Sequence, residues 1–154
     1  MTTTGDELQF VVFRVGPQEF ALNIFQVERI LRYEKPATLP KAPDFLEGVV
    51  QYASGVVPVI DLRKRLGVEA TLREETRLVV LELETQRVAV LVDQVLEVLR
   101  IDSGTIAAPP PMVRGLAAAY IAGIIARPGQ TIVILNAAKL FSSKERLALA
   151  SAGA

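Results

Sequence analysis

An internal duplication is the feature of this sequence that most restricts its fold. Residues 9–32 align without a gap on residues 77–100, and residues 45–66 align without a gap on residues 120–141. Chance similarity between apolar strands is the alternative, but both copies keep one order of strand, turn, strand, helical turn, loop, hairpin and polar cap. We therefore interpret the chain as a duplicated small β-barrel. The matched residues include Val11/Val79, Gln18/Gln86, Ala21/Ala89, Gln26/Gln94, Leu31/Leu99, Gly48/Gly123, Asp61/Asn136 and Lys64/Lys139.

The first copy begins with two predicted strands joined by a turn. Leu8–Val15 and Phe20–Ile24 are rich in β-branched and aromatic residues, and a Gly-Pro pair between them favours a turn. The apolar spacing then changes, which predicts a helical turn built on Val27, Ile30 and Leu31. The later expected elements are strands at Arg77–Leu83 and Val88–Val92, helical spacing of Val95, Val98 and Leu99, a hairpin of Tyr120–Ala126 with Thr131–Leu135, and a C-terminal helix over Lys139–Ala150.

The size of each copy predicts how the two copies are arranged. A barrel of about 60 residues buries too little surface to be stable alone, so the two lobes are expected to share an apolar seam. The chain is 51% hydrophobic and has no Trp, so Val, Leu, Ile and Ala must form the core. We expect one domain over 8–146, built from repeats at roughly 8–67 and 76–142, with flexible tails at 1–7 and 147–154. A groove is expected at the seam.

The composition excludes several classes of function. The 154 residues include neither Cys nor His, so no disulfide, Cys/His metal site or imidazole-based catalysis is available. We expect no enzyme activity, no metal and no cofactor. The formal net charge is zero, which argues against nucleic acid as a partner. The N-terminus does not resemble a secretory signal, and no apolar run is long enough for membrane insertion, so a soluble cytoplasmic protein is expected.

The stretch 48–67 contains the polar residues closest to a catalytic pattern. Asp61 and Asp93 each follow an apolar strand and could form a carboxylate pair. The second copy has Asn136 in place of Asp61, and an acid–base role would not tolerate that exchange, whereas a helix cap would. Asp61 is therefore predicted to cap a short helical turn. The basic run that follows, residues 63–65, is predicted to be a solvated helix face, and Pro58 to lie at a strand edge or bulge.

An ordered set of motifs over residues 8–141 resembles the CheW-type adaptors of bacterial chemosensory arrays. Each motif is weak alone, and the resemblance comes from their order along nearly the whole chain. The matching residues are Phe20–Ile24, Val27, Ile30, Leu39, Pro40, Ala42, Pro43, Gly48, Val49, Pro58–Arg63, Leu66 and Gly67 in the first copy, and Val92, Asp93, Val95, Ile106, Pro110, Tyr120, Ile121, Gly123, Leu135, Asn136, Lys139 and Leu140 in the second.

This resemblance implies a fold and a set of partners. The fold is a mainly β structure of two similar SH3-like five-stranded β-barrel lobes with short helical turns. The function is that of a non-enzymatic scaffold, which couples the cytoplasmic tips of methyl-accepting chemoreceptors to the histidine kinase CheA by binding its regulatory domain. The implied receptor-binding residues are Val27, Ile30, Gly48, Val49 and Ala53. From the residues alone, the face of Val27, Ile30 and Leu31 is more typical of core, and a partner-docking ridge is the alternative. Pairing at a strand edge could also build rings with the kinase or with further copies.

The sequence departs from the family at one turn. Family members commonly read Asn-Leu-Arg-Gly where this chain has residues 51–54, Gln-Tyr-Ala-Ser. Ala53 takes the place of the arginine, so a guanidinium capable of charge-assisted contacts is missing. The alternatives are an unusual receptor, a divergent chemosensory system such as one for pili or gliding, a ring-forming role, or a ligand-binding β-barrel sensor without an array role.

Overall fold

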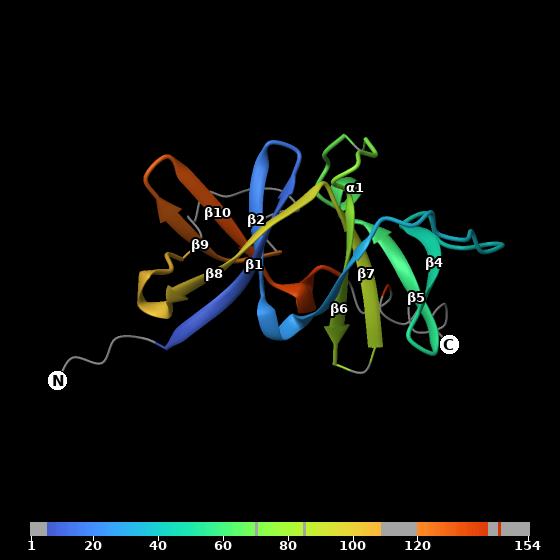
Figure 1. Ribbon diagram of the computed structural model, residues 1–154, viewed down its shortest axis with the longest axis horizontal. Coiled ribbons are helices and arrows are strands. Elements are labelled where there is room, and N and C mark those ends of the chain that lie inside the picture. Colours follow the sequence, from blue (N-terminus) through green and yellow to red (C-terminus); the bar gives the residue numbers. More distant parts are fainter. Residues whose placement is uncertain (1–5, 70, 85, 109–119, 142–144, 146–154) are drawn as a thin grey trace.

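A computed structural model describes residues 6–69, 71–84, 86–108, 120–141 and 145. Ten strands in these residues form two five-stranded sheets that lie side by side (Figure 1). The first sheet has the order β8-β1-β2-β10-β9, and its strands are β1 (Glu7–Val15), β2 (Gln18–Asn23), β8 (Gln94–Asp102), β9 (Ile121–Arg127) and β10 (Gln130–Leu135). The second sheet has the order β3-β6-β7-β5-β4, and its strands are β3 (Val27–Arg32), β4 (Leu46–Tyr52), β5 (Gly55–Asp61), β6 (Arg77–Leu83) and β7 (Gln86–Val92).

Short helical turns connect the strands. They are η1 (Ile24–Gln26), α1 (Leu62–Arg65), η2 (Ser103–Thr105) and η3 (Ala137–Lys139). The prediction of a mainly β fold in two related five-stranded units is thus confirmed. The helix predicted over 139–150 and the proline-rich part of the linker lie mostly outside the described residues.

The prediction that each repeat forms its own lobe is wrong. The first sheet takes β1 and β2 from the first copy and β8, β9 and β10 from the second, and the second sheet is the converse. The chain changes sheets after β2, so β3 pairs with β6, and it changes back after β7, so β8 pairs with β1. The duplication is therefore real, but its two copies exchange a part of each sheet.

The helical turn predicted at Val27, Ile30 and Leu31 is a strand, β3. A register shift between Val27 and Arg29 interrupts the simple alternation of the strand, which explains why the apolar spacing resembled a helix. The three residues consequently do not share one face. Val27 packs against the core between the sheets, Leu31 packs inside the second sheet, and Ile30 is 39% exposed.

The second copy shows the same arrangement in β8. Val95 packs against the core between the sheets and Leu99 packs inside the first sheet, while Val98 is 52% exposed. The helical spacing predicted there was wrong for the same reason. Residues at equivalent positions of β3 and β8 are thus buried or exposed in the same pattern, which is structural evidence for the duplication.

The core confirms the expected seam. The largest apolar cluster takes residues from both sheets, and two smaller clusters lie within one sheet each. Alternate residues of β6 and β7 enter different clusters, so both faces of these strands are buried, and their nearly continuous apolar sequences follow from this. In β6, for example, Val79 enters the seam cluster and Val80 enters the cluster of the second sheet.

Candidate functional site

The residues implied as receptor-binding all lie on the second sheet. Val27 and Ile30 belong to β3, Gly48 and Val49 belong to β4, and Ala53 lies in the turn between β4 and β5. β3 and β4 are the two edge strands of this sheet. The structure thus separates the five residues into one group on each edge.

Gly48 has a steric requirement for glycine. Its φ is +145°, and a Cβ atom at this position would lie 2.3 Å from the backbone oxygen of Ala37. Next to it, Val49 exchanges two backbone hydrogen bonds of 2.9 Å with Ala37. Gly48 therefore lets the segment after β3 lie directly on β4, and it shapes this edge without presenting a side chain.

A side-chain cluster joins the two edges of the second sheet. The hydroxyl of Tyr52 in β4 donates to Glu28 of β3 at 2.7 Å, and Arg87 of β7 donates to the same carboxylate at 2.8 Å. The guanidinium of Arg87 also lies over the Tyr52 ring, 5.7 Å from its centre. The hydrogen bond from Tyr52 is the main cause that lowers the pKa of Glu28, and the same bond raises the pKa of Tyr52. The sequence reasoning missed this cluster.

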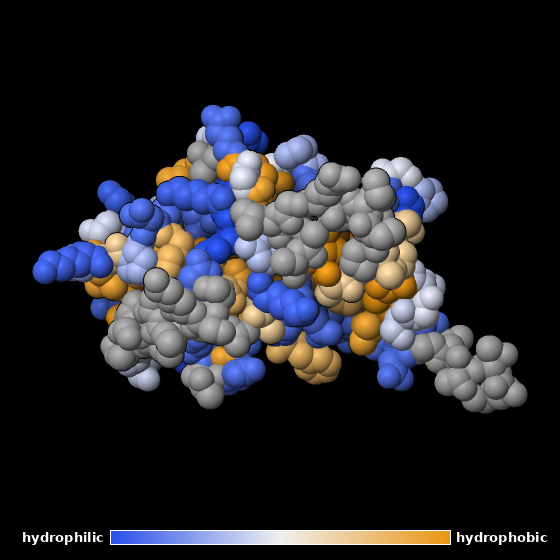
Figure 2. All heavy atoms as spheres, turned by 180° about the vertical axis from the view of Figure 1, so that it is seen from behind, coloured by the Kyte–Doolittle hydropathy of each residue, from blue (hydrophilic) through white to orange (hydrophobic). Residues whose placement is uncertain are grey.

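Exposed apolar side chains lie close to the predicted site in the sequence. Phe25 of η1 is 89% exposed, two residues before Val27. On the face seen in Figure 2, hydrophobic side chains occur in separate patches with hydrophilic ones between them. An exposed aromatic ring on a short, hydrogen-bonded turn is the type of side chain that anchors protein–protein contacts.

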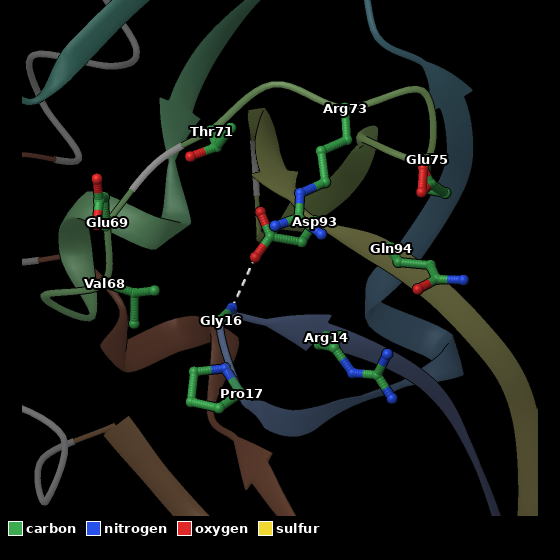
Figure 3. Close-up of a pocket in the computed structure, with 10 residues that line it drawn as sticks. All are labelled: Arg14, Gly16, Pro17, Val68, Glu69, Thr71, Arg73, Glu75, Asp93 and Gln94. Carbon is green, nitrogen blue, oxygen red and sulfur yellow. Dashed lines mark hydrogen bonds between the residues drawn. The ribbon is translucent and has the colours of Figure 1, made fainter.

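A pocket of about 320 Å³ lies elsewhere, at the seam. Figure 3 shows Asp93 between the turn that holds Gly16 and the loop that holds Thr71 and Arg73. Charged and polar side chains supply most of its lining, and the predicted receptor-binding residues do not take part. Apolar side chains of both sheets fill the core between them, and a receptor-binding groove at the seam stays a prediction.

A buried ionic network forms one wall of this pocket region. Arg63 of α1 donates to both oxygens of Asp61, from Nε at 2.9 Å and from Nη2 at 3.0 Å. Its Nη1 donates to the carbonyl of Thr71 at 2.8 Å and to Asp93 at 3.2 Å. The other oxygen of Asp93 accepts from the backbone N–H of Gly16 at 2.6 Å. The side chain of Arg63 is only 3% exposed.

This network corrects one prediction and confirms another. Residues 63–65 are not a solvated basic face, because Arg63 is buried and Arg65 lies between the rings of Phe45 and Phe141, at 5.7 and 5.6 Å. Only Lys64 is largely exposed. The prediction that Asp61 caps a helical turn is confirmed.

The polar residues of the site act through hydrogen bonds within the fold. Asp61 accepts from the backbone N–H of Arg63 at 3.0 Å, and its hydrogen bonds to the guanidinium are the main cause that raises the pKa of Arg63. The arginine therefore stays charged at any pH at which the protein is folded. The two aspartates considered as a carboxylate pair both form ion pairs with this one cation.

Pro58 lies inside the sheet, next to a bulge. It is buried in β5, one residue before β5 begins its parallel pairing with β7, and opposite it β4 carries a register shift between Leu46 and Gly48. β5 is thus not an edge strand; the edge strand of this hairpin is β4, with which Ala37 already pairs at Val49.

The fold and these sites define a class of protein. Two related β-sheets are packed across a common core, charged side chains are used for internal contacts, and edge strands and one exposed ring are left for partners. Within the described ranges, no group of acidic side chains could hold a metal ion. No helix in those ranges is long and apolar enough to cross a membrane. These are properties of an interaction module.

Comparison with known proteins identifies the family. The family model described as "CheW-like domain" matches residues 9–145, so the chain belongs to the CheW-like family. A chemotaxis protein CheW of Rhizobium meliloti is 31% identical, over 95% of this chain and 94% of its own. Protein FrzA of Myxococcus xanthus is 33% identical, over 94% and 91%. The crystal structure of the scaffolding protein TtCheW from Thermoanaerobacter tengcongensis has a TM-score of 0.81 and 30% identity, covering 89% of this chain and 94% of that chain.

Proposed function

We propose that this protein is a non-enzymatic adaptor of a bacterial chemosensory array, which couples methyl-accepting chemoreceptors to the histidine kinase CheA. The observation that carries the proposal is the match to a scaffolding CheW over nearly the full length of both chains. It implies a cytoplasmic location, because receptor tips and kinase meet there.

The proposal also names the receptor-binding surface. Val27, Ile30, Gly48, Val49 and Ala53 are proposed to contribute to it, with different roles. Ile30 is 39% exposed and would contact the partner directly. Gly48 is buried and would act by shaping the edge of β4. Val27 packs against the core between the sheets, so a charge introduced there would test the fold as much as the contact.

The duplication supplies a matched pair of variants for testing this surface. Ile30 and Val98 occupy equivalent positions of β3 and β8, and both are partly exposed. We expect Ile30→Asp to weaken binding of a receptor cytoplasmic fragment about tenfold, because a charge replaces an apolar contact. Val98→Asp should leave that affinity unchanged. Titration calorimetry with both variants would measure this, and equal losses would contradict the proposed surface.

The adaptor function itself is tested by binding of the unsubstituted protein. The probes are the regulatory domain of the CheA-type kinase and a receptor fragment from the same genome. We expect both to bind, and to bind together in one complex with the adaptor. Failure to bind any cognate kinase would overturn the proposal.

The alternative systems stay open to the same experiment. The identities to a CheW and to FrzA are similar, so they do not distinguish a standard chemotaxis array from a divergent chemosensory system. Ala53 in place of the family arginine is the residue that would favour an unusual receptor. The ligand-binding alternative relied on an apolar seam, but the pocket found at the seam is lined mostly by charged and polar side chains.

A further inference from the structure

The network around Arg63 lies where the two sheets meet. Asp61 ends β5 of the second sheet, Arg63 lies in α1 directly after it, and Gly16 follows β1 of the first sheet. Asp93 stands between β7 and β8, where the chain passes from the second sheet to the first. Asp93 therefore connects both sheets, through Arg63 on one side and Gly16 on the other. Figure 3 shows the hydrogen bond between Asp93 and Gly16.

The contacts at this junction are directional. Two N–H groups of the Arg63 guanidinium donate to the two oxygens of Asp61. This two-pronged contact fixes the plane of the guanidinium as well as its position. Asp93 is held in turn by its own backbone N–H, which donates to the carbonyl of Arg14 at 3.0 Å. The apolar core between the sheets gives association, but the hydrophobic effect has no preferred direction. The hydrogen bonds of Arg63 and Asp93, in contrast, require a defined orientation of the two sheets.

Gly16 itself has little free space beside its Cα atom, although a pocket of about 320 Å³ lies next to it. A Cβ atom on Gly16 would lie 2.5 Å from Cγ1 of Val68, in the loop after α1. A rotation of one sheet against the other would have to break a bond of Asp93 or press Gly16 against this loop. Breaking the bonds is costly, because it leaves a buried guanidinium with fewer partners.

Among the residues that the structure describes, the equivalent junction of the other copy has no such ionic network. By the alignment of the two copies, Phe25 corresponds to Asp93, Ala138 to Arg63 and Glu84 to Gly16. Phe25 is almost fully exposed, whereas the side chain of Asp93 is 20% exposed. The ionic contacts are thus a feature of one junction and not of the repeated fold.

We propose that Arg63 and Asp93 are positioning residues, which fix the angle between the two sheets and thereby the orientation of the receptor-binding surface on the second sheet relative to any contact that the same partner makes with the first sheet. The role in binding rests on the proposed adaptor function, whereas the role in fixing the angle does not. Neither side chain is required to touch a partner.

The test measures distances between the two sheets, which change when the angle between the sheets changes. The chain has no native cysteine, so Gln51→Cys on β4 and Glu97→Cys on β8 allow two spin labels without background, one on each sheet, and both sites are exposed. Distances between the labels are compared with and without Asp93→Asn. This substitution keeps the size of the side chain and an acceptor for Gly16, but removes the charge that pairs with Arg63. Affinities for the receptor fragment are measured on the same variants without labels.

The control is Asp102→Asn. Asp102 also follows a strand and accepts a backbone N–H, from Gly104 at 2.9 Å, but this contact lies at one end of the first sheet. We expect Asp93→Asn to broaden the distance distribution about twofold and to weaken receptor binding about tenfold, with the protein still folded by circular dichroism. Asp102→Asn should change neither. A distance distribution identical to that of the parent would overturn the proposal.

A second variant covers a loss of folding. Arg63→Lys keeps the positive charge and replaces the two-pronged contact with a single ammonium group. A folded Arg63→Lys protein is expected to show the same broadening. Unfolding of both variants would overturn a positioning role in favour of a purely structural one. Failure of the parent to bind receptor or kinase would refute the adaptor function alone, because the label distances do not depend on a partner.

Discussion

The turns that follow β5 and β10 occupy equivalent places in the two copies, and they differ in one respect. Asp61 and Asn136 each accept the backbone N–H of the residue two positions later, at 3.0 and 3.1 Å. The cap is therefore common to both. After the first cap comes Arg63, which is buried in an ionic network, and after the second comes Ala138, whose side chain carries no charge.

This difference shows what duplication preserves. The caps at Asp61 and Asn136 and the register shifts of β4 and β9 occur in both copies. Side-chain contacts have diverged, so that one junction is fixed by charges and the other exposes Phe25. The asymmetry gives a pseudo-symmetric fold two unlike ends, which an adaptor with two different partners needs. Exchanging residues between the copies tests each part of this comparison.

The largest loss of stability is expected at Gly48. Gly48 and its counterpart Gly123 lie in the first strand of the second hairpin of their copies, β4 and β9. At Gly48 a Cβ atom would meet backbone, the Ala37 oxygen at 2.3 Å, and φ is strained for other residues. We expect Gly48→Ala to lower the free energy of unfolding by about 4 kcal/mol, from backbone strain plus overpacking. Urea denaturation would measure it.

The matched variant is Gly123→Ala. Its Cβ atom would meet the end of a side chain, Cγ2 of Ile106 at 2.7 Å, which can move aside. A loss of about 1 kcal/mol is expected. Equal losses at the two glycines would show that the close approach on β4 has no special importance.

Exchanging the two caps separates the shared role from the unshared one. Asp61→Asn keeps a capping oxygen but removes the charge that Arg63 grips, and Asp61 is only 4% exposed. We expect a loss of about 2 to 3 kcal/mol, because a buried guanidinium then has weaker partners. The converse, Asn136→Asp, should change stability by about 0.5 kcal/mol or less, since Asp and Asn cap equally well. Thermal and urea unfolding of both variants would decide, and similar values would contradict a special role for Arg63.

Much of this comparison could be predicted from the sequence. The strands, their hairpins, both caps and the seam follow from β-branched runs, turn residues and the alignment of Asp61 on Asn136. The exchange of strands between the sheets could not be predicted, because each copy has the same local pattern whichever sheet it joins. β3 was misread because its bulge gave Val27, Ile30 and Leu31 a helical spacing.

The burial of Arg63 could not be predicted from local pattern either. Three basic residues in a row resemble a solvated surface, and the partner Asp93 lies 30 residues away in the sequence. The cluster of Glu28, Tyr52 and Arg87 was missed for the same reason, since its members come from three strands. One available signal was the alignment itself, which sets Arg63 against Ala138 and so marks a contact that only one copy makes.

A smaller loss of stability is expected from a change at Tyr52, where β3 and the end of β4 are joined by a side-chain hydrogen bond. Tyr52→Phe removes the hydrogen bond to Glu28 and should lower stability by less than Asp61→Asn. That bond lowers the pKa of Glu28, so its contribution is present above the ordinary pKa of a glutamate and is lost as the pH falls through the lowered value. The urea midpoints of parent and variant should therefore differ most at pH 7, and the difference should decrease as the pH is lowered into the acid range.

The controls for Tyr52 come from the same sheet and from the other copy. Tyr33→Phe, in a residue that packs against the apolar cluster of the second sheet, should give a difference that does not depend on pH. In the second copy Arg127 takes the place of Tyr52, and it meets Glu97 at 3.9 Å with both side chains exposed. Arg127→Gln should therefore change nothing measurable. A pH-independent effect of Tyr52→Phe would contradict the assigned bond.

The smallest changes in the free energy of unfolding are expected in the turns that join β4 to β5 and β9 to β10. The turn after β4 has Ala53 at φ +55°, whereas the turn after β9 uses Gly129 at φ +71°. An alanine in this conformation is strained by about 1 to 2 kcal/mol, and glycine removes that strain but adds entropy to the unfolded chain. We expect Ala53→Gly to raise the free energy of unfolding by about 0.5 kcal/mol and Gly129→Ala to lower it by about 1 kcal/mol. If Ala53→Gly is stabilising yet weakens receptor binding, the methyl group of Ala53 contacts the partner; a destabilising Ala53→Gly would mean that the turn holds no strain.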